Sequence, residues 1–438
     1  MFRQPPARFR ALVVLLLATG LAALAWGADS DDELKLVVIV SRHGVRAPLD
    51  VQQTYDKFAA QAFPKWDVPP GQLAPNGRTQ MELMGAYYRA RYVQAGLLTG
   101  KTELDTPGIF FRANNEQRTI ATAQALGTGL LPGAQPEIHA RPAGEADPLF
   151  RPVAAKVAEP DRERAVAAVL GRVGGDLHAV ELAHLPAFTT LERVLVGESG
   201  EIPPGKAAVL DLPAEVSPAS PEYALMVRGP LMTALSLTDL FMLEYANGLP
   251  MADVGWGRLT PGRLTELLEL HSLAFDLWFG TFYPAQVFVS NLASHLADTL
   301  TQAATGRAQP GAFGAPGQKL VVIAGHDSTQ ASLGALLGLE WRLPGTQRNP
   351  VLLCGALVFE LRERARDHQF LVRAYYVSPS LEQMRALTPL TLEHPPATAP
   401  IFLPDCSEGT PGFDAPLPKF EALVRRVIDP KFVTPGAL

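Results

Sequence analysis

Cysteine is scarce in this 438-residue chain, which holds only Cys354 and Cys406. Two thiols allow at most one disulfide, with a single connectivity. Two buried free thiols are the alternative, because a disulfide needs Cα atoms within about 7 Å and the sequence does not give their separation. The sequence therefore leaves both states of this pair open.

Basic residues show no excess either. The chain has 38 Lys and Arg against 44 Asp and Glu, which gives a formal charge of −6. Proteins that bind nucleic acid usually carry a basic excess or stripe, so we expect no nucleic-acid partner. An acidic protein can still bind an anion where its cations gather at one site. The sequence also lacks a carboxylate cluster of the metal-binding type, and we expect no metal and no cofactor.

Long apolar runs are missing except near the N-terminus, where residues 11–26 form one. Arginines precede this run, and small residues follow it at the positions that a signal peptidase recognises. The pattern predicts a signal peptide over residues 1–27 and a periplasmic or secreted protein, with no membrane contact after cleavage. An uncleaved anchor is the alternative, but the run is shorter than the roughly 20 residues that cross a bilayer.

Three apolar segments have the length and composition of buried strands, and helical patterns follow them. Because continuous apolar runs of this kind are typical of parallel sheets, the alternation predicts an α/β fold: a mainly parallel sheet flanked by helices. The predicted strands are 34–40, 108–112 and 319–324, and the predicted helices are 80–95, 116–131 and 328–337. Two further strands, 356–362 and 369–376, are expected to form a hairpin at the sheet edge.

Strand patterns become sparse in the middle of the chain. The helices expected there are 159–172, 179–195, 230–248 and 261–282. A helical subdomain inserted into the α/β domain is the simplest explanation. We therefore expect an α/β domain in two parts, 28–154 and 286–438, around a helical insert at 155–285.

The segment after the first predicted strand carries an unusual set of side chains. It reads Arg42-His43-Gly44-Val45-Arg46-Ala47-Pro48. Ligands of open α/β sheets lie at the carboxyl ends of strands, which places this segment at the expected site. Arg42 and Arg46 can each hold phosphate oxygens in bidentate fashion. Cations around His43 disfavour its protonation, so a ring nitrogen remains available for nucleophilic attack.

Two more groups follow the other predicted strands. His326 and Asp327 come directly after 319–324, where the carboxylic acid can protonate a leaving alkoxide and the histidine can donate to phosphate. Arg118 lies in the first turn of the helix after 108–112, where the helix dipole favours an anion. Together these residues predict phosphoryl transfer.

These motifs make the chain resemble the histidine acid phosphatases, the large branch of the histidine phosphatase superfamily. The resemblance is strongest to the bacterial periplasmic phytases and glucose-1-phosphatases. It implies that His43 is the nucleophile, that Arg42, Arg46, Arg118 and His326 bind phosphate, and that Asp327 is the proton donor. It extends to Trp66-Asp67-Val68-Pro69, Glu116-Gln117-Arg118-Thr119, Asp147-Pro148-Leu149-Phe150, Gly255-Trp256-Gly257 and Leu381-Glu382-Gln383-Met384-Arg385.

The sequence indicates the reaction more clearly than it indicates the substrate. Phytases of this group tend to have Thr-Lys where this chain has Leu49 and Asp50, whereas Gly44 has the phytase form. An aspartate repels a polyanion, so we expect a sugar phosphate such as glucose-1-phosphate, with phytase activity as the alternative. A catalytically silent phosphate-ester binding protein would need the arginines but neither His43 nor Asp327. A phosphomutase would not need export. The oligomeric state is not determined by the sequence.

Overall fold

The computed structural model describes residues 32–49, 52–409 and 412–436. The predicted signal peptide and Asp50 lie outside the described residues. Within the described part, no helix combines the length and the apolar character needed to cross a membrane.

A single mixed sheet forms the centre of the α/β part, in the order β10-β8-β7-β1-β6-β2-β3. The strands β1, β6, β2 and β3 are mutually parallel, while β7 and β8 form an antiparallel hairpin beside β1. The apolar centres of β1 and β6 are fully buried, as their composition predicts. The strand bounds are β1 Glu33–Arg42, β2 Ile109–Ala113, β3 Ile138–His139, β6 Leu320–Gly325, β7 Ala356–Glu363, β8 Phe370–Ser378, β9 Ala397–Ile401 and β10 Ala415–Pro416.

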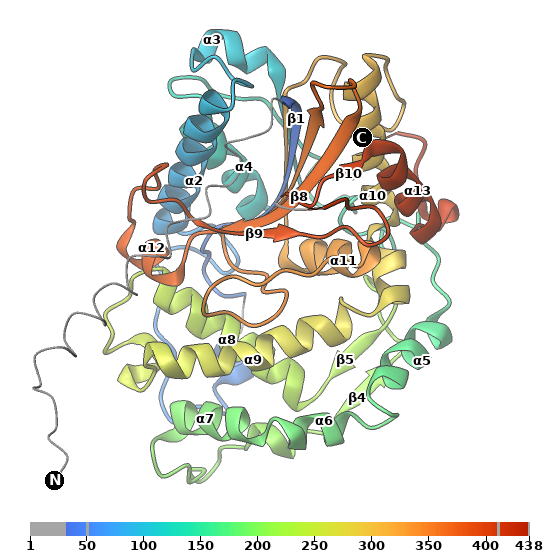
Figure 1. Cartoon of the computed structure of the whole chain (residues 1–438). Helices are drawn as coiled ribbons and strands as arrows, with labels where there is room; N and C mark the ends of the chain where they lie inside the picture. The colour runs from blue at the N-terminus through green and yellow to red at the C-terminus, as the bar shows by residue number, and fades with distance from the viewer. Residues whose placement is uncertain (1–31, 50–51, 410–411, 437–438) are drawn as a thin grey trace, which may run out of the picture.

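Helices cover both sides of this sheet, with α2 and α4 on one side and α10, α11 and α13 on the other (Figure 1). Helices α2 and α4 pack closely against each other because glycines lie at their contact. A Cβ atom added at Gly85 would lie 2.2 Å from the Leu126 carbonyl oxygen, and one at Gly129 would lie 2.0 Å from that of Glu82. The bounds are α2 Pro75–Gln94, α4 Gln117–Leu130, α10 Phe282–Thr305, α11 Asp327–Leu337 and α13 Leu417–Val427. The α/β fold predicted from the sequence is confirmed.

A helical layer lies against the carboxyl ends of the parallel strands, in the lower half of Figure 1. It contains α5 Arg162–Arg172, α6 Leu177–Ala183, α7 Leu185–Val196, α8 Pro230–Ala246 and α9 Pro261–Trp278, with a small hairpin of β4 Glu215–Ser217 and β5 Met226–Arg228. The remaining short helices are α1 Gln52–Tyr55, α3 Thr102–Asp105 and α12 Leu381–Ala386. The division at 28–154, 155–285 and 286–438 stays a prediction, and α10 runs through its second boundary.

Three sequence expectations need correction. The helix predicted over 179–195 is two helices, because the backbone leaves the helical region at His184 and α7 begins anew with a proline in its first turn. The helix predicted over 261–282 ends at Trp278, and α10 follows after a short turn. The hairpin expected at the sheet edge is internal, because β7 pairs with β1 while β9 and β10 pair with β8.

The two cysteines are both free and buried. The thiol of Cys354 donates to Gln80 Oε1 over 3.7 Å, and the thiol of Cys406 donates to the Lys419 carbonyl oxygen over 3.3 Å. The disulfide alternative is therefore wrong, because the fold places the two thiols among different partners.

Candidate active site

The predicted site residues meet at one edge of the sheet. β1, β6 and β2 are parallel neighbours, with Arg42 in register with Gly325 and Ala113 in register with Ala324. Their carboxyl ends therefore lie side by side, and the chain segments that leave them face a common space. The backbone N–H of His43 donates to the Gly325 carbonyl oxygen over 3.1 Å, which joins the first two segments directly.

The loop after His43 packs tightly on the start of α2. A Cβ atom at Gly44 would lie 2.8 Å from the Gly77 carbonyl oxygen, and one at Gly77 would lie 2.0 Å from that of Val45. Both positions therefore require glycine, because any side chain would separate the loop from the helix. This close contact fixes the position of the His43 ring.

His43 is buried, and its ring tautomer follows from its contacts. Nδ1 lies 2.8 Å from the Gly44 carbonyl oxygen, which can only accept, so Nδ1 carries the proton. Nε2 is left with a free lone pair. Burial lowers the pKa of His43 well below its ordinary value, and the charges of Arg118, Arg46 and Arg42 lower it further. The ring is therefore neutral and its Nε2 can act as a nucleophile.

Arg42 and Arg46 are held in fixed orientations. The fully buried guanidinium of Arg42 donates to the Val351 carbonyl oxygen over 2.6 Å and forms a 2.8 Å ion pair with Asp327 Oδ2. Asp239 bridges the two arginines: its Oδ1 lies 2.8 Å from Arg42 and its Oδ2 lies 3.0 Å from Arg46. The two cations are thus oriented before any ligand arrives.

Asp239 was not identified from the sequence. Burial by itself would raise its pKa, but Arg42, Arg46 and His271 outweigh that effect and hold the pKa at about 2. A signal was present, because Asp239 and Glu244 are the only charged residues of α8, which is otherwise apolar or neutral. The pattern could not give the partners, which lie almost 200 positions earlier in the chain.

His326 and Asp327 begin α11 at the end of β6. The backbone N–H of Asn115 donates to Asn114 Oδ1, so the amide nitrogen of Asn114 faces His326 Nε2, 2.7 Å away, and donates to it. His326 therefore carries its proton on Nδ1, as a donor. Its ring lies edge-on to that of His43, with 5.7 Å between centroids. Asp327 accepts from the Ser328 N–H through Oδ1, and its side chain is 21% exposed.

Arg118 reaches the same space from the first turn of α4, as predicted, but it is not unpaired. Its guanidinium forms an ion pair with Glu116, which also pairs with Arg151. Arg151 pairs in turn with Glu222. Glu116 and Arg151 were not identified as site residues from the sequence, although Glu116 belongs to a quoted motif.

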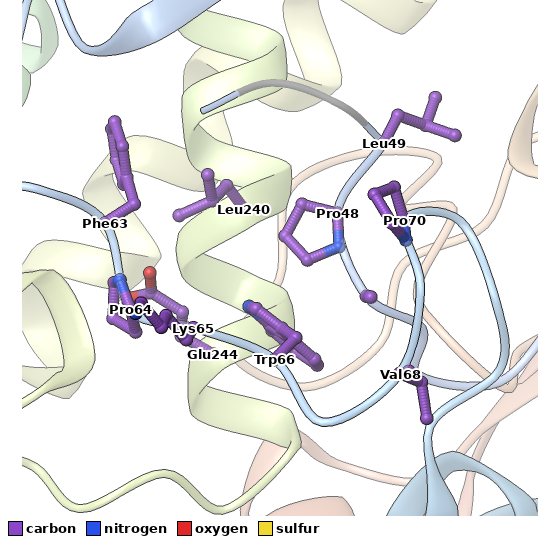
Figure 2. A pocket seen from close by; sticks show the side chains of 11 residues that line it. Pro48, Leu49, Phe63, Pro64, Lys65, Trp66, Val68, Pro70, Leu240 and Glu244 are labelled. Atoms are coloured by element: carbon purple, nitrogen blue, oxygen red, sulfur yellow. The ribbon is translucent and has the colours of Figure 1, made fainter. Parts of the chain in front are cut away.

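Two adjoining cavities open beside these residues. The first, the catalytic cleft, has a volume of about 160 Å³ and is lined by Arg46, Pro48, Leu49, Leu235, Ser236, Asp239, Leu240, Leu243, Phe275 and Asp327. The second, the Trp66 pocket, has a volume of about 300 Å³ and shares Pro48, Leu49 and Leu240 with the cleft. Its walls come from α8, from the chain between Phe63 and Pro70, and from the segment Ala47 to Leu49 (Figure 2).

The described residues offer no obvious place for a metal ion. Among them, no three His, Cys, Asp or Glu side chains come together as a metal site would require. The polar groups around His43 are instead arginines, histidines and the carboxylates that pair with them. Such a set can bind a phosphoryl group and stabilise its negative charge.

Comparison with known proteins agrees with this chemistry. The family model of the histidine phosphatase superfamily (branch 2) matches residues 33–166. The chain is 34% identical to phytase AppA of Escherichia coli (strain K12), over 87% of this chain and 89% of that protein. It is 30% identical to a glucose-1-phosphatase of Salmonella typhimurium, over 89% of this chain and 91% of that protein.

Solved structures give the same result. The phytase of Hafnia alvei in complex with tartrate has a TM-score of 0.84 and 31% identity, over 93% of this chain and 100% of that chain. The phytase of Citrobacter braakii has a TM-score of 0.83 and 31% identity, over 92% of this chain and 100% of that chain. The chain therefore belongs to the histidine phosphatase superfamily (branch 2) and is a histidine-type acid phosphatase, an enzyme that hydrolyses phosphomonoesters.

Proposed function

We propose that hydrolysis proceeds through a phosphohistidine on His43. Nε2 of His43 attacks phosphorus in line, and the bond from phosphorus to the alcohol oxygen breaks as the new N–P bond forms. Asp327, in its protonated form, gives its proton to the leaving alkoxide. In the second step water attacks the phosphohistidine, Asp327 takes a proton from that water, and phosphate leaves with His43 regenerated.

Arg42, Arg46, Arg118 and His326 would hold the phosphoryl oxygens during both steps. The transition state spreads negative charge over the equatorial oxygens, and fixed donors stabilise that charge most when they need no reorganisation. The observation that carries this proposal is the His43 tautomer. Nδ1 is committed to the Gly44 carbonyl oxygen, so the free lone pair lies on Nε2 in a group of three arginines.

The covalent step can be tested by trapping the intermediate. Wild-type enzyme is mixed with a ³²P-labelled ester and quenched within milliseconds in alkali. A phosphohistidine keeps its label in alkali and loses it in acid, and the label should map to the peptide that contains His43. Turnover without any labelled protein, in an enzyme whose second step is shown to be rate-limiting, would contradict the mechanism.

For the substrate, we propose a small monophosphate such as a sugar phosphate rather than phytate. Four leucines and Phe275 make up half of the residues that line the cleft, and one of them, Leu49, is 53% exposed. A polyanion calls for cations around the mouth, and Arg46 is the only cation among the residues that line the cleft. The relatives named phytase make phytate the competing substrate.

The test is a comparison of kcat/KM for glucose-1-phosphate and phytate at one acid pH and one ionic strength, with EDTA present. We expect glucose-1-phosphate to be preferred. A clear preference for phytate would mean that cations elsewhere attract the polyanion and that Leu49 does not control entry.

Export to the periplasm or the medium is proposed on residues 1–27 alone. Expression of the full chain in a Gram-negative host, followed by fractionation and N-terminal sequencing, tests it. Intact protein in the cytoplasm, still carrying residues 1–27, would contradict it.

A further inference from the structure

The Trp66 pocket adjoins the catalytic cleft but has a different lining. Its walls are mostly apolar, with Phe63, Trp66, Leu240 and several prolines, and Lys65 is its only cation. Leu240 and Glu244 lie one helical turn apart on α8 and face the pocket together (Figure 2). Arg46 and Asp327 line the cleft, and Pro48 and Leu240 line both cavities. The alcohol part of an ester held beside Arg46 and Asp327 can therefore extend over Pro48 and Leu240 into the pocket.

The turn at Gly255 and Trp256 holds two walls of this pocket in place. Both residues have positive φ, at 51° and 55°. The N–H of Gly255 donates to Glu244 Oε2 over 2.9 Å, and the indole N–H of Trp256 donates to the Ala62 carbonyl oxygen over 2.8 Å. The Trp256 ring also packs on Phe63, with centroids 4.9 Å apart. The pocket is therefore formed by the fold before any ligand enters.

Glu244 lines this pocket and has one buried carboxyl oxygen without a partner. The residue is 1% exposed, and its Oε1 is buried with no hydrogen bond, whereas Oε2 accepts from Gly255. Burial raises the pKa of Glu244 to about 8, against the lowering effect of the Gly255 bond. The carboxyl group is thus neutral at acid pH, and its proton lies on Oε1. A buried polar atom without a partner is costly, so a ligand that meets Oε1 gains that interaction.

We propose that the Trp66 pocket is the subsite for the alcohol part of the ester and takes an uncharged, hydroxyl-bearing ring. One face of the ring packs on the indole of Trp66, and one hydroxyl meets Glu244 Oε1. Aromatic and apolar walls favour the C–H face of a ring, and the single polar atom selects a hydroxyl. A highly phosphorylated ring is disfavoured, because Lys65 is the only cation in the lining. This inference rests on the proposed function.

The test uses three esters that differ only beyond the phosphate. Glucose 6-phosphate has the ring and its hydroxyls, cyclohexylmethyl phosphate has a similar ring without them, and methyl phosphate is too short to enter the pocket. Glu244→Leu should raise KM for glucose 6-phosphate about tenfold, as expected for one lost hydrogen bond, with kcat little changed. It should raise KM for cyclohexylmethyl phosphate far less, because that ester loses only the wall contact through Gly255, and it should leave methyl phosphate unchanged. Trp66→Ala should raise KM for both ring esters and not for methyl phosphate.

Two further variants separate this role from a structural one. Glu244→Gln keeps an acceptor for Gly255 and an N–H donor toward the pocket, so it should bind glucose 6-phosphate as the wild type does. Glu192→Leu is the matched control: Glu192 accepts from the Val209 N–H over 2.6 Å, its Oε2 is buried without a partner, and it lines neither cavity. It should change stability but no KM.

The outcomes distinguish the two proposals. Failure of wild-type enzyme to hydrolyse methyl phosphate would count against the proposed function. Normal hydrolysis of methyl phosphate, with the same change for all three esters in Glu244→Leu or with no change for any, would overturn the subsite alone.

Discussion

The catalytic cleft and the Trp66 pocket differ in whether their buried ionisable side chains form ion pairs. Around His43, Arg42 and Arg46 share Asp239, and Arg118 pairs with Glu116. In the Trp66 pocket, the buried carboxyl oxygen of Glu244 has no partner. A paired network keeps its donors in place while charge develops on phosphorus, and an unpaired polar atom in an apolar pocket selects a ligand group. The first region suits a reaction common to all phosphomonoesters, and the second suits a choice among alcohols.

The largest expected effect on the catalytic cleft comes from removing its nucleophile. His43→Ala should lower turnover by about four orders of magnitude or more, because it removes the nucleophile of the proposed covalent step. Phosphate should still bind, since all the arginines remain. Steady-state assays and calorimetric titration with inorganic phosphate measure the two effects. Substantial turnover by the purified variant would contradict the covalent mechanism.

Removing the proton donor should affect only some substrates. Asp327→Asn keeps an acceptor for the Ser328 N–H but cannot donate a carboxyl proton, so alkyl esters should lose about a hundredfold or more. p-Nitrophenyl phosphate should lose far less in the first step, because nitrophenolate leaves without a proton. Stopped-flow measurement of the nitrophenolate burst separates this step from the second. Equal first-step losses on both esters would mean that Asp327 is not the acid.

Asp239 gives a smaller, graded test of the paired network. Asp239→Asn keeps the shape but removes the charge between Arg42 and Arg46, and we expect kcat/KM to fall about tenfold for every ester. Asp276→Asn is the control, because Asp276 also pairs with two arginines, Arg172 and Arg348, but at the protein surface. It should change kcat/KM by less than about twofold. Similar losses in both variants would show that pre-orientation of the cations has no special effect.

The smallest expected effect concerns pH. The nucleophile must be unprotonated, and the folded protein lowers the pKa of His43 well below 6.5. As pH falls through 6.5, the ring therefore stays neutral, and protonation of His43 should not reduce kcat/KM there. A pH profile of the wild type from neutral to strongly acid pH measures this. A loss of kcat/KM centred near 6.5 would mean that the surrounding cations do not control the His43 ring.

Much of the catalytic cleft could be predicted because its signals are local. Apolar runs identified the strands that became β1, β2 and β6, and parallel neighbours must end at one edge. Any polar side chain directly after such a strand is therefore brought to that edge, and His43, His326 and Asp327 all lie there. Only chain order and strand direction are needed for this inference.

The features that the sequence did not predict depend on contacts between segments that are distant in the chain. Glycine contacts, the antiparallel strands beside β8 and the break at His184 all depend on neighbours that no spacing encodes. Asp239 is one of two charged residues in an otherwise apolar or neutral helix, but only the packing of α8 over the strand ends brings it to two arginines. The Trp66 pocket likewise exists only where α8, the chain from Phe63 to Pro70 and the Pro48 segment meet. The sequence alone determined the reaction, because the reacting side chains directly follow strand ends. The tertiary structure decided which residues pair with those side chains and where the second pocket lies, because ion pairs and cavities arise only between segments that folding brings together.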